Sequence, residues 1–153
     1  MKSGGSLIRA TDAQGRLLGA ATARLLNQAS VHAIQERLRA AGVGLQLVGN
    51  LVGELKSSAV TPAARGQGIG SAMVRERLDY LRGQGCRYAV SASWVSNNGA
   101  HSSLGPLARA GFERVAAIPG YWAADQEAAG YLCEDCGAAC TCTAIIMIHR
   151  FGS

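Results

Sequence analysis

The segment from Arg65 to Ser71 carries three glycines, at positions 66, 68 and 70, between a strand-like stretch and a helical one. Glycine has no Cβ, so the N–H groups of such a loop can approach an anion closely at the positive end of the following helix. Pyrophosphate groups are held in this way, so the loop is interpreted as a pyrophosphate site. The alternative interpretation is an ordinary glycine-rich turn between a strand and a helix. Two phosphate motifs are excluded, because no Lys-Ser or Lys-Thr follows the last glycine and no further G-x-x-G step follows Ser71.

Four of the five cysteines lie within ten residues, in the pattern Cys133-x2-Cys136-x3-Cys140-x-Cys142. Four thiolates are the soft tetrahedral ligand set that zinc favours, so residues 131–143 predict a metal knuckle. One short loop supplying all four ligands would be cramped, which leaves His32, His101 or His149 as a possible fourth ligand. The alternatives are reduced thiols or a local disulfide, and the spacing suits an iron–sulfur cluster less well. The remaining thiol, Cys86, is interpreted as a small buried hydrophobe.

Strands and helices in the N-terminal half must position these residues. Residues 7–11 and 16–23 flank a polar turn and predict a β-hairpin. Residues 28–41 have apolar side chains at three- and four-residue steps, with Ser30 as the expected N-cap and Gly42 as the stop, and predict an amphipathic helix. Residues 45–60 are strand-like, although two glycines and Asn50 suggest a bulge or two strands.

The C-terminal half continues the alternation. A helical pattern that includes Met73, Arg77 and Leu81 runs from the glycine loop to the glycines at 83 and 85. Strands are expected at 87–95, 112–118 and 144–148, with a helix within 100–110 and a loop or short helix at 121–130. We therefore expect an α/β (α+β) fold in which a mixed, mostly antiparallel central sheet is flanked by helices.

Composition narrows the classes of function. The 153 residues suit one domain, and 48% hydrophobic with 16% charged residues exclude a disordered chain. The net charge of +5 comes from dispersed arginines, which pair well with phosphate, and aromatics are only 5%, so we expect no nucleic-acid partner. No apolar run reaches the roughly 18 to 20 residues of a membrane helix, so we expect no membrane partner and a cytoplasmic location.

The strand ending at Val60, Pro62 and the Arg65-x-x-Gly68-x-Gly70 loop together resemble the cofactor loop of the GNAT superfamily of acyl-CoA N-acyltransferases. The 15–19 hairpin and the Ala110-Gly111-Phe112 step extend this resemblance to roughly residues 7–118. It implies a single GNAT-like domain over 1–153 that binds CoA. It also implies that Gly66 turns the loop, that Arg65 adds charge, and that the main chain of Ser58, Ala59 and Val60 pairs with the pantetheine arm. The pyrophosphate would be held by the amides of Gln67, Gly68, Ile69, Gly70 and Ser71.

Two departures from the family pattern affect catalysis. Leu107 occupies the position where many members have a tyrosine that protonates the departing thiolate. The chain also begins as if at the family's second strand, and the helix near 31–41 is a candidate replacement for the missing wall of the acceptor site.

The resemblance suggests several residues for the chemistry. Glu54 is the candidate base and Tyr121 or His101 the candidate acid, while Asn98, or its neighbour Asn97, lies near the family's cofactor asparagine. The competing interpretations are a salt-bridged strand carboxylate for Glu54, core packing for Tyr121, a helix cap or surface role for His101 and a turn role for Asn98.

These inferences predict an N-acyltransferase that moves an acetyl group from acetyl-CoA to a primary amine, with zinc as a second candidate cofactor. Two alternatives remain open: a non-catalytic CoA-binding regulatory module and a thiol or metal sensor. The predicted partners are a CoA thioester and an amine acceptor, and a homodimer is left open.

Overall fold

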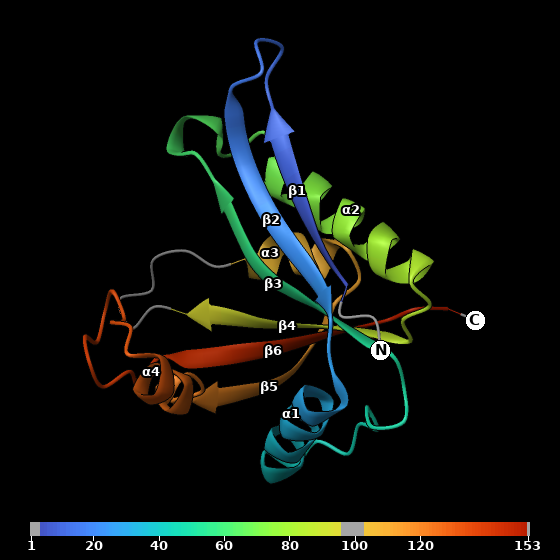
Figure 1. Ribbon diagram of the computed structural model, residues 1–153, viewed down its shortest axis with the longest axis vertical. Helices are drawn as coiled ribbons and strands as arrows, with labels where there is room; N and C mark the ends of the chain where they lie inside the picture. The colour runs from blue at the N-terminus through green and yellow to red at the C-terminus, as the bar shows by residue number, and fades with distance from the viewer. Residues whose placement is uncertain (1–3, 96–102, 153) are drawn as a thin grey trace.

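The computed structural model describes residues 4–95 and 103–152, and its six strands form one sheet in the order β1-β2-β3-β4-β6-β5 (Figure 1). Among the described strands β3 and β4 are the one parallel pair, and the other neighbours are antiparallel. The mixed, mostly antiparallel sheet predicted from the sequence is therefore confirmed. The strands are β1 (Gly5–Thr11), β2 (Leu17–Leu25), β3 (Val52–Val60), β4 (Tyr88–Val95), β5 (Glu113–Pro119) and β6 (Thr143–Arg150).

Helices cover both faces of the sheet. One core lies beneath α2 (Ile69–Gly83) and α3 (Leu104–Arg109), and the other lies beneath α1 (Gln28–Ala40). In β6, Ile145 and Met147 enter the first core, whereas Ile146 and Ile148 enter the second. Burial on both faces explains why this strand reads as a continuous apolar run. The short helices η1 (Pro62–Ala64) and α4 (Ala123–Ala129) complete the secondary structure of the described residues.

Two local predictions are wrong. Asn27, rather than Ser30, is the N-cap of α1, because its side-chain oxygen accepts a hydrogen bond from the Ser30 N–H at 2.8 Å. Residues 45–51 are irregular instead of strand-like, since the buried Gln35 side chain accepts hydrogen bonds from the N–H groups of Leu47 and Val48, both at 2.7 Å. A side chain thus replaces the strand partner that this backbone would otherwise need.

Beyond their first residues, β3 and β4 separate. They pair only from Val52–Glu54 to Tyr88–Val90, while β2 and β6 stay hydrogen-bonded to the outer edges of the two strands (Figure 1). The pairing of β2 with β3 skips Lys56, so the bulge suggested by the sequence lies there rather than at the glycines. Gly53 lies inside β3 because a Cβ at this position would overlap the Leu81 side chain of α2. The separation of β3 and β4 opens the sheet at its centre.

None of the described helices is long and apolar enough to cross a membrane.

Candidate active site

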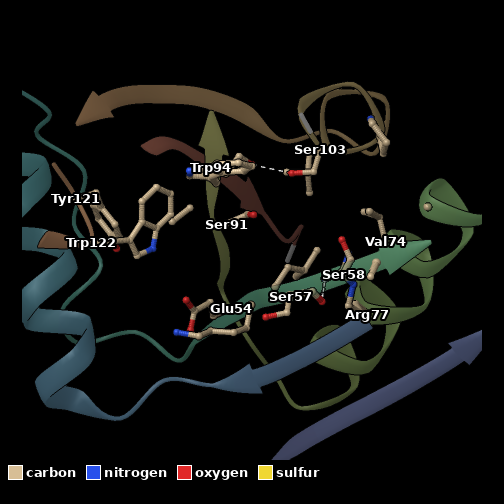
Figure 2. Close-up of a pocket in the computed structure, with 18 of the residues that line it drawn as sticks. Glu54, Ser57, Ser58, Val74, Arg77, Ser91, Trp94, Ser103, Tyr121 and Trp122 are labelled. Carbon is tan, nitrogen blue, oxygen red and sulfur yellow. Dashed lines mark hydrogen bonds between the residues drawn. The ribbon is translucent and has the colours of Figure 1, made fainter. Parts of the chain in front are cut away.

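A cleft of about 1640 Å³ occupies the gap between β3 and β4. Figure 2 shows Glu54, Ser57 and Ser58 along β3, with Ser91 and Trp94 on β4 across the gap. Arg77 lies toward the α2 end of the cleft, and Tyr121 and Trp122 lie at the opposite end, beside α1. The cleft is therefore long, with one end at the glycine loop and the other beneath an aromatic pair.

The glycine loop has the backbone geometry that an anion site requires. Gly66 and Gly68 have φ of +78° and +80°, a left-handed conformation that suits glycine, and Gly68 is the N-cap of α2. The N–H of Ala72 donates to the Gly68 carbonyl at 3.0 Å, which is the first hydrogen bond of the helical pattern. The N–H groups of the three preceding residues therefore belong to the helix N-terminus, where the backbone of the helix offers them no acceptor. The predicted loop residues line the cleft at Arg65, Gly66 and 68–71, whereas Gln67 is not among its lining residues.

The edge of β3 that faces the cleft is available for main-chain pairing. Ser58, Ala59 and Val60 line the cleft and pair with β2 on their other edge. No strand of the described chain pairs with them on the cleft side, because β4 has already diverged. The Arg65 Nε–H donates to the Val60 carbonyl at 3.3 Å and anchors the start of the loop to the strand. This edge suits a ligand that carries its own amide groups.

Two arginines at the loop end were not predicted as site residues. Arg109 of α3 lines the cleft and donates from Nη2 to the Ser71 hydroxyl at 3.3 Å, which brings a second cation to the start of α2. Arg77 is only 3% exposed, and its guanidinium donates to the carbonyls of Met73, Thr22 and Ser57. Burial lowers the pKa of Arg77 to about 10, so it remains charged at neutral pH. The sequence indicated only that Arg77 shares the face of α2 with apolar residues.

Glu54 lies in the middle of the cleft and forms an ion pair with Arg24 of β2, at 2.7 Å between Oε2 and Nε. The Glu54 side chain is 13% exposed. The structure therefore shows the salt-bridged carboxylate that the sequence analysis offered as an alternative, but places it within the cleft. An ionised carboxylate held in this way can accept a proton directly or through water.

Tyr121 closes the far end of the cleft. Its ring lies 4.1 Å from the Arg37 guanidinium of α1, and its carbonyl accepts a hydrogen bond from Arg37 Nη1 at 2.6 Å. Trp122 packs edge-on against it, with ring centroids 5.3 Å apart. Burial raises the pKa of Tyr121, and the nearby Glu54 and Asp125 carboxylates raise it further despite the opposing charge of Arg37. The phenol therefore stays protonated at neutral pH.

The remaining acid positions differ from the family pattern. Leu107 has no ionisable group and contributes no proton, and its side chain is 2% exposed and packs in the core beneath α2 and α3. The Ser93 and Ser103 hydroxyls, which no spacing in the sequence singled out, lie 3.1 Å apart in the cleft wall. The predicted residues His101 and Asn98, together with Asn97, lie outside the described residues.

The four clustered cysteines converge beside the cleft. Their sulfur atoms all lie within 4.8 Å of one another, and Cys133 and Cys140 also line the cleft. No histidine is needed as a ligand: His149 packs against Phe112 and Phe151, and His32 is exposed on α1. Cys86 is buried in the main core, where desolvation raises the pKa of its thiol to about 11, as expected for an inert thiol.

Solved structures share this architecture. The NatC complex bound to Gag peptide and CoA is 17% identical, with a TM-score of 0.61 over 95% of this chain and 71% of that chain. A GNAT family acetyltransferase from Elizabethkingia anophelis with acetyl-CoA bound is 14% identical, with a TM-score of 0.63 over 96% and 76%. Arylalkylamine N-acetyltransferase 2 from Aedes aegypti is 14% identical, with a TM-score of 0.62 over 95% and 73%.

No curated protein sequence matches the chain. The model of the acetyltransferase (GNAT) family matches residues 2–112, which include the hairpin, the divergent strand β3, the glycine loop and α3. This match covers most of the chain, and the fold and the cleft agree with it. The chain therefore belongs to the GNAT family of acetyltransferases.

Proposed function

We propose that the protein transfers the acetyl group of acetyl-CoA to a primary amine within the cleft between β3 and β4. The observation that carries this proposal is the continuity of the cleft. It runs from the N–H groups at the start of α2, along the edge of β3 that no described strand pairs with, to Glu54 and Tyr121. Pyrophosphate, pantetheine and thioester occur in the same order along acetyl-CoA, which supports their binding in that order.

In the proposed reaction the amine nitrogen attacks the thioester carbonyl, the new C–N bond forms and the C–S bond breaks. Glu54 accepts the proton that the amine must lose, and Tyr121 donates a proton to the departing thiolate. A free thiol has a pKa of about 8.5, so the thiolate can also leave unprotonated. For this reason the replacement of the family's tyrosine by Leu107 does not abolish the reaction. Holding the amine and the thioester in contact contributes at least as much as either proton transfer.

The acceptor end of the cleft suits a cationic amine. Asp125 and Glu134 line it together with Glu54, and the Asp125 carboxylate is close enough to Tyr121 to influence the pKa of the phenol. Ile34 and Arg37 of α1 line the same cleft, which supports the idea that this helix forms a wall of the acceptor site.

The test is steady-state thiol release from acetyl-CoA with a panel of amines that includes polyamines, aminoglycosides and peptide N-termini. We expect amine-dependent release by the wild type that is absent from Gly68→Val, a variant designed to lose CoA. If the wild type binds CoA but no amine increases thiol release, the second candidate function, a CoA-binding regulatory module, replaces the first. The buried Leu107 in the acid position is the observation that favours this second function.

A further inference from the structure

The cysteine cluster, defined as Cys133, Cys136, Cys140 and Cys142, lies outside the segment matched by the family model. The Sγ atom of Cys142 is 3.7 Å from that of Cys133 and 3.5 Å from that of Cys136. Four sulfurs placed tetrahedrally about 2.3 Å from a zinc ion are about 3.8 Å from one another. The spacing therefore matches a single tetrahedral ion, and it exceeds the roughly 2.05 Å of a disulfide bond.

The backbone around the cluster is held in place without a metal. Cys133 and Gly137 exchange two N–H···O bonds of 2.9 Å, and Gly137 has a φ of +72°, which turns the chain tightly around Cys136. Gln126 of α4 is 3% exposed and donates from its amide to the Gly137 carbonyl. Its side-chain oxygen accepts the Cys140 N–H at 2.8 Å. One buried amide thus joins the Cys133–Cys136 half of the cluster to the Cys140–Cys142 half.

The chemistry of the four donors selects the ion. Four thiolates and no carboxylate form a soft ligand set, which discriminates against magnesium, calcium and manganese. A set of four protein ligands leaves no open coordination position for catalysis. Sulfurs that all lie within 4.8 Å of one another can share one ion, whereas the ligands of a four-iron cluster each bind a different iron and stand farther apart.

We propose that Cys133, Cys136, Cys140 and Cys142 together bind one structural Zn²⁺ ion, which joins α4 to the start of β6 and stiffens the acceptor wall of the cleft. The cluster follows α4, and Cys142 directly precedes β6. Two features connect it to the cleft: Cys133 and Cys140 line the cavity, and β6 pairs with β4, where Trp94, which also lines the cavity, lies opposite Ala144. Zinc binding displaces any thiol protons, and no cysteine is oxidised or reduced.

The first experiment measures metal in protein purified without chelators. We expect about one zinc per chain, no iron and no visible absorbance. Cys136→Ser should lose most of the zinc. Cys86→Ser is the matched control, because it makes the same substitution at a buried thiol of the main core, away from the cluster. This variant should keep about one zinc per chain. A zinc content in Cys136→Ser equal to that of the control would overturn the ligand assignment.

The second experiment uses the wild-type chain and does not depend on whether a variant folds. After zinc is removed with a chelator, Co²⁺ titration should saturate at about one ion per chain, with the sulfur-to-cobalt charge-transfer band and visible bands of a tetrahedral thiolate site. Excess Zn²⁺ should displace the cobalt. Zinc-free protein should unfold at a lower temperature than the zinc-bound form, because the ion binds only the folded loop.

Three results would overturn the proposal: wild-type protein that neither contains zinc nor takes up cobalt, native disulfides among the four cysteines found by mass spectrometry, or stoichiometric iron with visible absorbance. These measurements require no acetyl transfer, so their outcome is independent of the proposed function.

Discussion

At the scale of single residues, the site depends on what surrounds each ionisable group. In the proposed mechanism, Glu54 can act as a base because its ion pair with Arg24 holds its side chain in the cleft, and Tyr121 can act as an acid because burial and two neighbouring carboxylates keep its phenol protonated. Neither environment can be seen from the residue types. Both can be tested by substitutions that leave the shape of the side chain almost unchanged.

We expect Glu54→Gln to slow amine-dependent thiol release by about 10²- to 10⁴-fold, the usual range for loss of a general base. CoA affinity measured by calorimetry should not change, because Glu54 lies away from the glycine loop. Glu36→Gln is the matched control: Glu36 also pairs with an arginine at 2.7 Å, but on the exposed side of α1. Equal turnover by Glu54→Gln and the control would remove Glu54 from the mechanism.

Tyr121→Phe should also lower kcat while preserving CoA binding, and its effect should exceed that of Glu54→Gln if Tyr121 has taken over the acid role. The phenylalanine ring keeps the packing against Trp122 and the contact with Arg37, so a structural explanation is weakened. Because the pKa of the phenol is raised, wild-type turnover should not decline through loss of this proton below about pH 10. Tyr80→Phe, on α2, is the control, and similar kinetics for the two variants would exclude Tyr121 as the acid.

At the scale of elements, the proposed CoA site lies where a strand ends and a helix begins. The glycine loop lies at one end of the cleft because β3 stops at Val60, η1 turns the chain and α2 then starts at Ile69. Arg109 shows that a second helix contributes as well, through its bond to Ser71.

Gly68→Val should reduce CoA affinity below detection in calorimetry. A β-branched side chain at a φ of +80° is strained by about 1–3 kcal/mol, and the loop can relieve this only by moving the amides that face the anion. Gly83→Ala is the matched control, since it lies at the other end of α2, where a Cβ would meet no atom within 4 Å. It should bind CoA like the wild type. Unchanged CoA affinity in Gly68→Val would show that the loop is not the anion site.

At the scale of the whole molecule, stability should depend on pH through His149. This imidazole packs between Phe112 and Phe151, and its Nδ1 atom is buried without a hydrogen-bond partner among the described residues. Desolvation lowers its pKa, and the charge of Arg82 lowers it further, against the effect of the nearby Gly111 backbone, which raises it. The folded protein therefore binds this proton less readily than the unfolded chain.

His149 should thus make its full contribution to stability above about pH 6.5. The free energy of unfolding should decrease as the pH falls toward the lowered folded-state pKa. Urea unfolding at several pH values should show a smaller decrease for His149→Phe, which lacks the proton site and keeps an aromatic ring. His32→Gln removes an exposed histidine of α1 and controls for the change in composition. If His149→Phe retains the full pH dependence, another group is responsible.

Local patterns in the sequence predicted much of this structure because their physical causes are contained in a few consecutive residues. The glycine loop required only that glycines precede a helix, and the spacing of the cysteines predicted a cluster of thiols whose sulfur atoms the structure brings within 4.8 Å of one another. The alternation of strands and helices was also predicted, since the periodicity of apolar residues reflects which side chains are buried. The errors at Ser30 and at residues 45–51 arose where neighbouring polar side chains, Asn27 and Gln35, bonded to the backbone instead.

The amino-acid sequence by itself determined the glycine loop, the order of elements and the identity of the clustered thiols. Only the tertiary structure decided that β3 and β4 separate, that Glu54 and Tyr121 share one cleft, and that Arg77 and Arg109 gather at its loop end. It also decided that all four sulfurs converge, through Gln126 and the turn at Gly137. The contacts of the cleft join segments far apart in the chain, so they depend on how packed layers meet rather than on any local spacing of residue types.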